Sequence, residues 1–273
     1  TPRQNGRVCP ARKRASPMDN SLAIGLATQK LLQQRMDVTA NNLANVDTTG
    51  FKVESVIARQ LEERPASTVE RPNDVSFAES WQLQRDMRTG PLERTGNPLD
   101  VAIAGEGFFS IGGVGEDTLY TRDGSFNIDE NGRLVSRTGL PVLGQTANGD
   151  GAYVEGAGGE IIIDEALGPV TITQAGAIMQ GNNEIARLDI VAFDTPAALE
   201  KRGGNLLAAT DEQPREPVNL RVEQGQLEGS NVQAVLELTR MIDISRTYQS
   251  VAKMISEQNN MREQAISKLA RLR

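Results

Sequence analysis

The hydrophobic period of the chain changes twice, and this change restricts the possible folds more than any other feature of the sequence. Near the amino end, seam positions recur every three or four residues, at Leu32, Met36, Thr39, Leu43 and Val46. After Gly229 the same period returns at Met241, Ile244, Tyr248, Val251 and Ile255, with a second stripe at Val235, Leu238 and Ile242. This spacing is typical of amphipathic helices that pack against another helix. The sequence therefore predicts a helix near each end of the chain.

Local signals give the expected bounds of these helices. Residues 19–21 and 230–231 offer side-chain oxygens that can cap a helix start. Gly50 is suited to a left-handed helix stop, with Phe51 packing back onto the last turns. We expect the first helix over about residues 21–47 and the second from the cap at 230–231 to about residue 269.

The middle of the chain has the character of β-strands. Short apolar and β-branched runs lie between Gly, Asn and Asp, at residues 101–104, 108–111, 160–163, 170–173 and 188–193. Asn131 and Gly132 separate two further runs and predict a tight hairpin. The fold class is thus α+β: N- and C-terminal helices pair as a coiled-coil-like assembly domain, with an inserted antiparallel all-β domain.

These patterns divide the chain into five expected segments. Residues 1–17 form a basic leader, which we expect to be disordered or to precede a true start at Met18. Residues 18–51 form the N-terminal assembly helix and 52–99 a connector with short strands, in which Trp81 packs locally. Residues 100–225 form the β domain, and 226–273 the C-terminal assembly helix.

The residue types that are absent argue against catalysis. The chain has no His, and its one Cys is Cys9 in the leader. Without these residues the commonest general base, metal ligand and nucleophile–base pairs are missing. We therefore expect a protein that is not an enzyme and that has no catalytic residue, cofactor or metal.

Charge and hydropathy exclude other classes of partner. The leader holds five basic residues and no acid, so residues 18–273 carry 24 basic and 36 acidic residues, a net charge of −12. A body this acidic is repelled by phosphate backbones, so we expect no nucleic-acid partner. No apolar run is long enough for membrane insertion. The run at residues 22–27 is too short for a cleaved secretory signal, so we expect no ordinary secretion by that route.

The two helices need more partners than each other. Each seam offers about five apolar residues worth roughly 1.5–3 kcal/mol apiece when buried. Ordering the backbone costs roughly 1–2 kcal/mol per residue, only partly offset by helical hydrogen bonds. A lone two-helix hairpin is therefore marginal, and identical neighbouring subunits are the economical source of further burial.

Three asparagines close to the end of the first helix strengthen this prediction. Asn41, Asn42 and Asn45 are mediocre helix formers, and each amide can both donate and accept hydrogen bonds to adjoining helices. The alternative is that they mark fraying before the turn at Thr48. The expected assembly interface comprises Leu32, Met36, Asn41, Asn42, Leu43, Asn45, Val46, Gly50, Phe51, Val235, Leu238, Met241, Ile242, Ile244, Tyr248, Val251 and Ile255.

Four blocks of sequence resemble one known family. ANNLANVDTTGFK at residues 40–52 is similar to the signature of bacterial flagellar rod and hook axial proteins. TGNPLDVAIAGEGFF at 95–109, YTRDGSF at 120–126 followed by NGRLV at 131–135, and QLEGSNV at 226–232 resemble further blocks of that family in the same order. The resemblance covers residues 18–269, and its specificity lies in the combination of blocks.

The resemblance implies a structural subunit of the flagellar basal-body rod, exported unfolded through the flagellar type III apparatus. Its terminal helices would form the inner tube of a torque-transmitting drive shaft that crosses the periplasm, beside copies of itself and neighbouring rod proteins. The opening at residues 18–21 is similar to proximal-rod members. The alternatives are a distal-rod or hook paralogue or, from a different class, a monomeric β-domain binding module whose ends cover its own core.

Three weaker patterns favour turns over binding sites. Residues 127–132 imitate half of a calcium loop, but Thr138 stands where a bidentate Glu is needed. The glycines at 105–107 and 156–159 lack the spacing of phosphate loops. Asp123 and Asp129 have the residue type of a glycosidase pair, but both fall at expected hairpin ends, where Asp is an ordinary turn residue.

Overall fold

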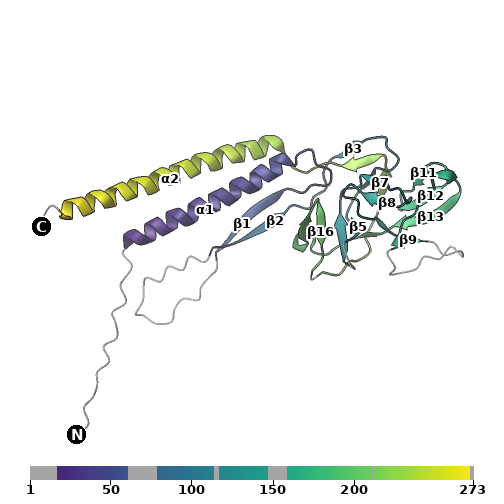
Figure 1. The fold of residues 1–273 in the computed structure, drawn as a ribbon, viewed down its shortest axis with the longest axis horizontal. Coiled ribbons are helices and arrows are strands. Elements are labelled where there is room, and N and C mark those ends of the chain that lie inside the picture. Colours follow the sequence, from purple (N-terminus) through teal and green to yellow (C-terminus); the bar gives the residue numbers. More distant parts are fainter. Residues whose placement is uncertain (1–16, 61–78, 114–116, 147–158, 211, 271–273) are drawn as a thin grey trace, which may run out of the picture. The chain divides into compact units, whose positions relative to one another are not determined.

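The structure is a computed structural model that describes residues 17–60, 79–113, 117–146, 159–210 and 212–270 (Figure 1). Most of the basic leader, including Cys9, lies outside the described residues. The chain divides into two compact units. A helical unit comprises Thr1–Asp37, Ala58–Trp81 and Thr239–Arg273, and a β unit comprises Val38–Ile57 and Gln82–Leu238. None of the described helices is apolar over a stretch long enough to cross a membrane.

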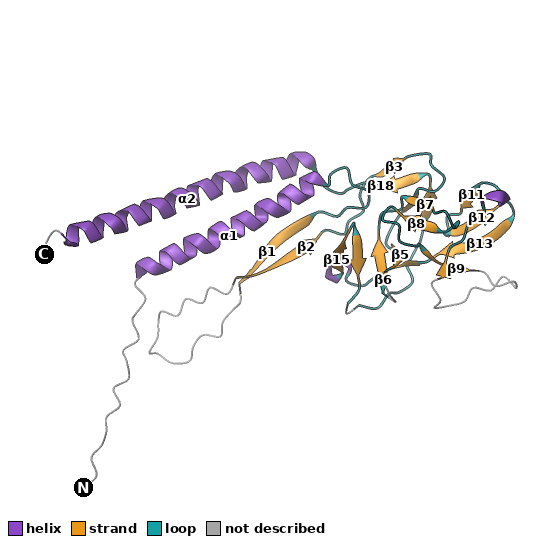
Figure 2. Cartoon of the chain, in the orientation of Figure 1, coloured by secondary structure: helices purple, strands orange, loops and turns teal. Residues whose placement is uncertain are grey.

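Two long helices form where the period predicts them. Helix α1 spans Pro17–Ala44 and α2 spans Ala234–Ala270 (Figure 2). Helix α1 begins four residues before the expected start and ends three residues before the expected end. It ends early because the Asn45 amide turns back to the Asn41 carbonyl oxygen, 2.8 Å away. Gly50 has the predicted left-handed conformation, with φ +69°, but it lies six residues after the end of α1 and is therefore not the helix stop.

In the helical unit, α1 and α2 run antiparallel. Gln29 Nε2 donates to the Tyr248 hydroxyl at 2.7 Å. One turn earlier on α1, a Cβ added to Gly25 would lie 3.0 Å from Ile255 Cγ1. The predicted seam positions Tyr248 and Ile255 are both half-buried at this contact. The helices therefore touch along a seam that one chain covers only in part.

The β unit is built from short strands in two five-stranded sheets. One has the order β10-β9-β13-β12-β11 and the other β14-β5-β6-β16-β15. Neighbouring strands within both sheets are antiparallel. The strands of the first sheet are β9 (Leu143–Thr146), β10 (Gly159–Glu160), β11 (Val170–Ile172), β12 (Ala177–Gln180) and β13 (Asn183–Leu188). Those of the second are β5 (Phe108–Gly112), β6 (Thr118–Thr121), β14 (Ile190–Val191), β15 (Glu200–Gly203) and β16 (Leu206–Ala208).

Two-stranded sheets complete the fold. They pair β1 (Glu54–Gln60) with β2 (Glu79–Arg85), β3 (Leu92–Arg94) with β18 (Gln226–Glu228), β4 (Val101–Ile103) with β17 (Val222–Gln224), and β7 (Phe126–Ile128) with β8 (Leu134–Ser136). The β7–β8 pair confirms the hairpin expected at Asn131 and Gly132. Short 3-10 turns occur at Glu165–Leu167 and Pro196–Ala198.

The main core lies within the β unit. Phe109 and Phe126 are almost fully buried, and their rings meet edge to face with centroids 5.1 Å apart. The run expected as a strand at 160–163 is shorter than predicted, since β10 ends at Glu160. Beyond it, Ile161 and Ile163 still point into the core while Ile162 is exposed. Alternating burial thus persists beyond β10, where Ile162 forms an isolated antiparallel bridge with Arg133.

Candidate functional site: a buried polar junction at the helix bases

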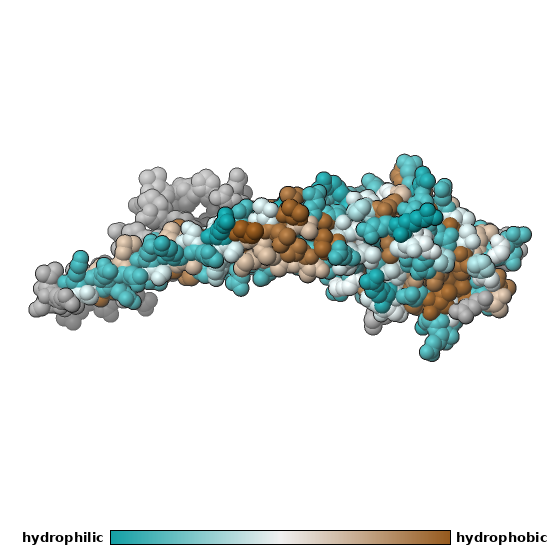
Figure 3. All heavy atoms as spheres, turned by 90° about the horizontal axis from the view of Figure 1, so that it is seen from above, coloured by the Kyte–Doolittle hydropathy of each residue, from teal (hydrophilic) through white to brown (hydrophobic). Residues whose placement is uncertain are grey.

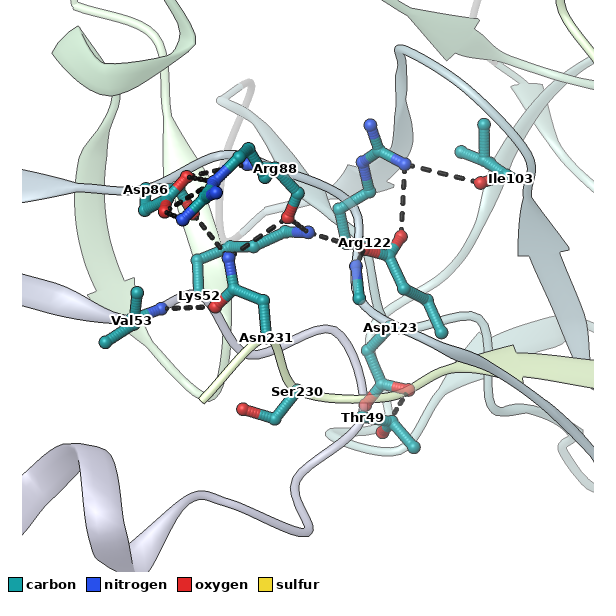
Figure 4. Close-up of polar contacts among 12 residues, drawn as sticks. Thr49, Lys52, Val53, Asp86, Arg88, Ile103, Arg122, Asp123, Ser230 and Asn231 are labelled. Carbon is teal, nitrogen blue, oxygen red and sulfur yellow. Dashed lines mark hydrogen bonds and ion pairs between the residues drawn. The ribbon is translucent and has the colours of Figure 1, made fainter. Parts of the chain in front are cut away.

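A fully buried carboxylate forms the centre of the candidate site. Glu228, the last residue of β18, has no exposed side-chain surface and pairs with the Lys52 ammonium. Its Oε1 also accepts the backbone N–H of Gly90 at 2.9 Å, and its Oε2 accepts Arg122 Nη1 at 3.1 Å. Figure 4 shows how Lys52 and Arg122 lie close together in this junction. One carboxylate therefore holds two cations that are far apart in the sequence.

The two cations are themselves nearly buried. Burial lowers the pKa of the Lys52 ammonium, although the neighbouring Glu228 carboxylate opposes this shift. Burial likewise lowers the pKa of the Arg122 guanidinium against the pull of Glu228. Arg122 Nη2 donates to the Gly105 carbonyl at 2.8 Å, and the guanidinium lies 5.2 Å from the centroid of the Phe108 ring. Such a cluster is costly to leave incompletely paired.

Asn42 joins three elements of the same chain. Its side chain is almost fully buried. Its Oδ1 accepts the backbone N–H of Glu54 at 3.0 Å, and its Nδ2 donates to the Glu54 carbonyl at 2.8 Å and to Glu237 Oε2 at 3.2 Å. The amide thereby imitates a β-ladder partner for β1 while contacting α2. Its hydrogen bonds are made within the subunit.

The other two asparagines of the motif act locally. Asn45 Nδ2 donates to the Asn41 carbonyl, and its Oδ1 accepts the Thr48 hydroxyl at 3.2 Å. Asn41 Oδ1 accepts a second, longer bond from Asn45 Nδ2 at 3.2 Å. These bonds close the end of α1 in an ordered way, so the asparagines do not mark a frayed helix end.

Asn231 ties the start of the C-terminal segment to the N-terminal one. Its Oδ1 accepts the Val53 N–H at 2.8 Å, and its Nδ2 donates to the carbonyls of Asp86 and Arg88 at 2.8 and 3.0 Å (Figure 4). The expected helix cap at residues 230–231 is wrong, because α2 begins only at Ala234. The Asn231 amide bonds backbone groups of Val53, Asp86 and Arg88 and does not cap the helix.

The turn after α1 sits directly on the β domain. Gly50 N–H donates to the Glu228 carbonyl at 2.7 Å, and the Thr49 hydroxyl donates to Asp123 at 2.8 Å. Asn205 Nδ2 donates to the Thr49 carbonyl at 2.9 Å. A Cβ on Gly50 would lie 2.6 Å from the Asp123 backbone nitrogen. The position thus needs glycine for its positive φ and for the close approach.

The carboxylates that sequence reasoning weighed as a catalytic pair are occupied by structural bonds. Asp123 accepts the Thr49 and Ser125 hydroxyls, and Asp129 accepts Arg133 Nε at 2.8 Å. Within the described ranges, no group of three or more His, Cys, Asp or Glu side chains could hold a metal ion. The geometry favours a joint between chain segments.

Comparison with known proteins identifies the family. Three family models match: "Flagella basal body rod protein" over residues 22–52, "Flagellar hook protein FlgE/F/G D1 domain" over 102–180 and "Flagellar basal body rod FlgEFG protein C-terminal" over 223–268. The chain is 38% identical to the flagellar basal-body rod protein FlgF of Caulobacter vibrioides, across 93% of this chain and 100% of that protein. The chain belongs to the FlgF family. It is a structural subunit of the bacterial flagellar basal-body rod.

Other relatives place the chain among the rod paralogues. FlgF of Mesorhizobium japonicum is 32% identical over 92% of this chain and 98% of that protein. FlgG of Agrobacterium fabrum is also 32% identical, over 88% of this chain and 96% of that protein. The FlgF assignment agrees with the similarity of residues 18–21 to proximal-rod members.

The expected interface residues fall into three classes of burial in the structure. Four are buried within the single chain: Leu32, Asn42, Gly50 and Phe51. Ten are half-buried, namely Met36, Asn41, Leu43, Asn45, Val46, Met241, Ile244, Tyr248, Val251 and Ile255. Three are exposed: Val235, Leu238 and Ile242. The buried group has little surface left for a neighbour, so its contribution is to the fold of the subunit.

Sequence reasoning missed the charged centre of the junction. Lys52, Arg122 and Glu228 come from three of the blocks that resemble the family, at 40–52, 120–126 and 226–232. Two of these blocks also contain an acidic residue, Asp47 or Asp123. Because charged residues are usually exposed, no single charge in these blocks indicates burial.

Proposed function

We propose that the chain polymerises through α1 and α2, with the helices of neighbouring copies packed side by side into the inner wall of a torque-transmitting shaft. Its partners are other copies of itself and neighbouring rod proteins. It reaches this place through the flagellar type III export apparatus, in a rod that crosses the periplasm. Its role is mechanical and non-catalytic, and it needs no cofactor.

An exposed apolar stripe on α2 carries this proposal. Val235, Leu238 and Ile242 are spaced by three and four residues and are 75%, 46% and 52% exposed. Seen from above in Figure 3, apolar side chains gather where α2 begins. A contiguous apolar surface of this kind on a protein is typical of an interaction site. Packing of another helix onto it removes it from water.

The seam between the helices supports the same proposal. Met241, Ile244 and Val251 are half-buried, which supports coiled-coil-like pairing of α1 with α2. Further along α2, Met254, Met261 and Ile266 are about half exposed or more. Copies that share these faces gain the burial that a single helix pair lacks.

The proposed division of labour follows the expected segments. Residues 18–51 and 226–273 assemble, residues 100–225 form the β domain, and residues 52–99 connect them. The polar junction sets the bases of both helices on the β domain of the same subunit.

The experiment replaces the stripe in the full chain with Val235→Ser, Leu238→Ser and Ile242→Ser together. We expect unchanged folding of the β unit but loss of self-association in analytical ultracentrifugation and loss of incorporation into isolated basal bodies. The matched control is Ile162→Ser with Leu167→Ser, since these apolar side chains are 60% and 59% exposed on the β unit. Normal incorporation of the stripe variant would overturn the proposal.

A second measurement tests the need for partners directly. In dilute solution we expect protease to cut α1 and α2 while the β unit resists, and assembly should protect both helices. A chain that lacks everything after Gly229 should give a soluble β domain that cannot join a rod. Resistant helices in a dilute monomer would favour the monomeric binding module instead.

A further inference from the structure

The charged centre of the junction combines three segments. Among the described residues, Lys52 and Arg122 form ion pairs only with Glu228, while Asp86 and Glu106 act on them more weakly from further away. Lys52 follows α1, Arg122 follows β6, and Glu228 precedes α2. The side chains of Lys52 and Arg122 are 5% and 6% exposed, and that of Glu228 is 0% exposed. Two cations and one anion are therefore buried together with a net charge of +1.

Glu228 is the only carboxylate that bonds either cation among the described residues. The remaining acceptors of Lys52 and Arg122 are the neutral carbonyls of Arg88, Ile103 and Gly105. The Arg122 Nε has no partner within the described part of the chain. Without the Glu228 carboxylate, two like charges would face each other in a site from which water is excluded, and burial of unpaired charge is strongly unfavourable.

The backbone around Glu228 holds the same N-terminal segment. Its carbonyl accepts the Gly50 N–H at 2.7 Å, and three residues later Asn231 accepts the Val53 N–H at 2.8 Å. On its other side, Glu228 reaches the β domain through Arg122. The stretch from Glu228 to Asn231 thus lies between the segment after α1 and the β domain, and bonds both.

We propose that Glu228 is an electrostatic latch, which lets the segment after α1 seat on the β domain only together with the segment before α2. Neither the end of α1 nor the start of α2 is held in place unless both segments are bound. Arrival of the C-terminal segment neutralises one cation, completes the Gly50 and Val53 bonds, and sets the bases of both helices in one step. The latch acts within one subunit and does not depend on polymerisation.

The test uses amide hydrogen exchange on the full chain at a concentration where it is monomeric. Glu228→Gln keeps the side-chain shape and an acceptor for Gly90, but it removes the charge. We expect exchange of the Gly50 and Val53 amides to rise on the order of 100-fold. Amides of the core strand β12 should be unchanged. Glu223→Gln is the matched control, since Glu223 pairs with Arg221 at the surface, and it should change exchange less than about twofold.

Two further variants separate charge from packing. Lys52→Met leaves the neutral Arg122–Glu228 pair, so its effect should be at least about tenfold smaller than that of Glu228→Gln. Adding Lys52→Met to Glu228→Gln lowers the net charge of the cluster from +2 back to +1 and should restore part of the lost protection. If the two single variants have equal effects, or if their effects simply add, the latch is wrong.

The latch can still be tested if Glu228→Gln unfolds the whole chain. In that case the double variant should fold and protect Gly50, because it again carries one unpaired cation at most. Failure of the double variant to fold would overturn the latch while leaving the proposed polymerisation untouched. If the chain does not self-associate while its latch is intact, the proposed polymerisation is overturned and the latch is not affected.

Discussion

The β unit and the helical unit cover their apolar side chains to different extents. In the β unit, Phe109, Ile111 and Ile178 are completely buried. In the helical unit, Leu32 is buried, but Ile24 and Leu26 on the same helix are 45% and 53% exposed. The β unit therefore closes its own interior, whereas the helices leave apolar faces open along their length. A part that buries its own apolar side chains is thus joined to a part that leaves several of them exposed.

The largest effect that separates the two units should come from Phe109→Ala. Removal of this ring leaves a cavity beside Phe126 in the middle of the core and should lower the free energy of unfolding of the β unit by about 3–5 kcal/mol. Chemical denaturation followed by β-unit amide exchange measures the loss. Exchange in α1 and α2 of the monomer should stay the same. A parallel loss of protection in both helices would mean that the two units share one cooperative core.

A somewhat smaller loss is expected from Gly124→Ala in the same unit. An added Cβ would lie 1.7 Å from the Val101 carbonyl oxygen, a backbone atom held in β4. Because backbone cannot rotate away, the strand must shift, at about 2–3 kcal/mol. Thermal unfolding of the purified chain gives the value.

Gly139→Ala is the matched control for this substitution. Gly139 lies in a bend and, unlike Gly124, has a positive φ of +80°, but nothing lies within 4 Å of its added Cβ. The cost should be about 1 kcal/mol, from backbone strain alone. Equal costs at Gly124 and Gly139 would show that crowding in the β unit is weak.

Local rules predicted the parts of the fold that depend on neighbouring residues. The helix at each end, the left-handed Gly50 and the hairpin at Asn131 and Gly132 all follow from spacing or turn chemistry. The order of the second sheet does not, because β5 pairs with β14 some eighty positions away along the chain. No local pattern in the sequence encodes that pairing.

The junction shows the same limit for the candidate site. The amides of the motif were correctly read as hydrogen-bonding groups, but the partner of Asn42 is Glu54 of its own chain. Glu228 gave no signal of burial, since an isolated Glu in a sequence indicates surface. Its environment exists only after Lys52 and Arg122 arrive from distant blocks. Ion pairs between residues that are far apart in the sequence cannot be predicted from local patterns.

In the helical unit, Leu32→Ala should destabilise α1 by an amount near the lower end of the range for a buried leucine. Only one side of the seam is covered in the monomer, so we expect a loss of about 2 kcal/mol in the local stability of α1, measured by exchange of its amides. Leu26→Ala, at a 53% exposed position, should cost less than about 0.5 kcal/mol in the monomer. Equal effects in the monomer would contradict the seam that we describe.

The smallest effect should come from Gly25→Ala, the helical counterpart of Gly124→Ala. Alanine favours a helix over glycine by about 1 kcal/mol. Its Cβ would lie 3.0 and 3.2 Å from two carbon atoms of Ile255, but these belong to a half-buried side chain that can move. The monomer should therefore become more stable by less than about 1 kcal/mol in thermal unfolding of α1.

Whether Gly25→Ala stabilises or destabilises the chain tests directly how tightly the helix seam is packed. If neighbouring subunits confine Ile255 in the rod, the same alanine should become unfavourable there and reduce incorporation. Adding Ile255→Val, which removes the Cδ1 atom, should then restore incorporation. A loss of 2 kcal/mol or more in the dilute monomer would instead mean that Ile255 is already immobile. The helix seam would then be packed as tightly as the β core without any partner.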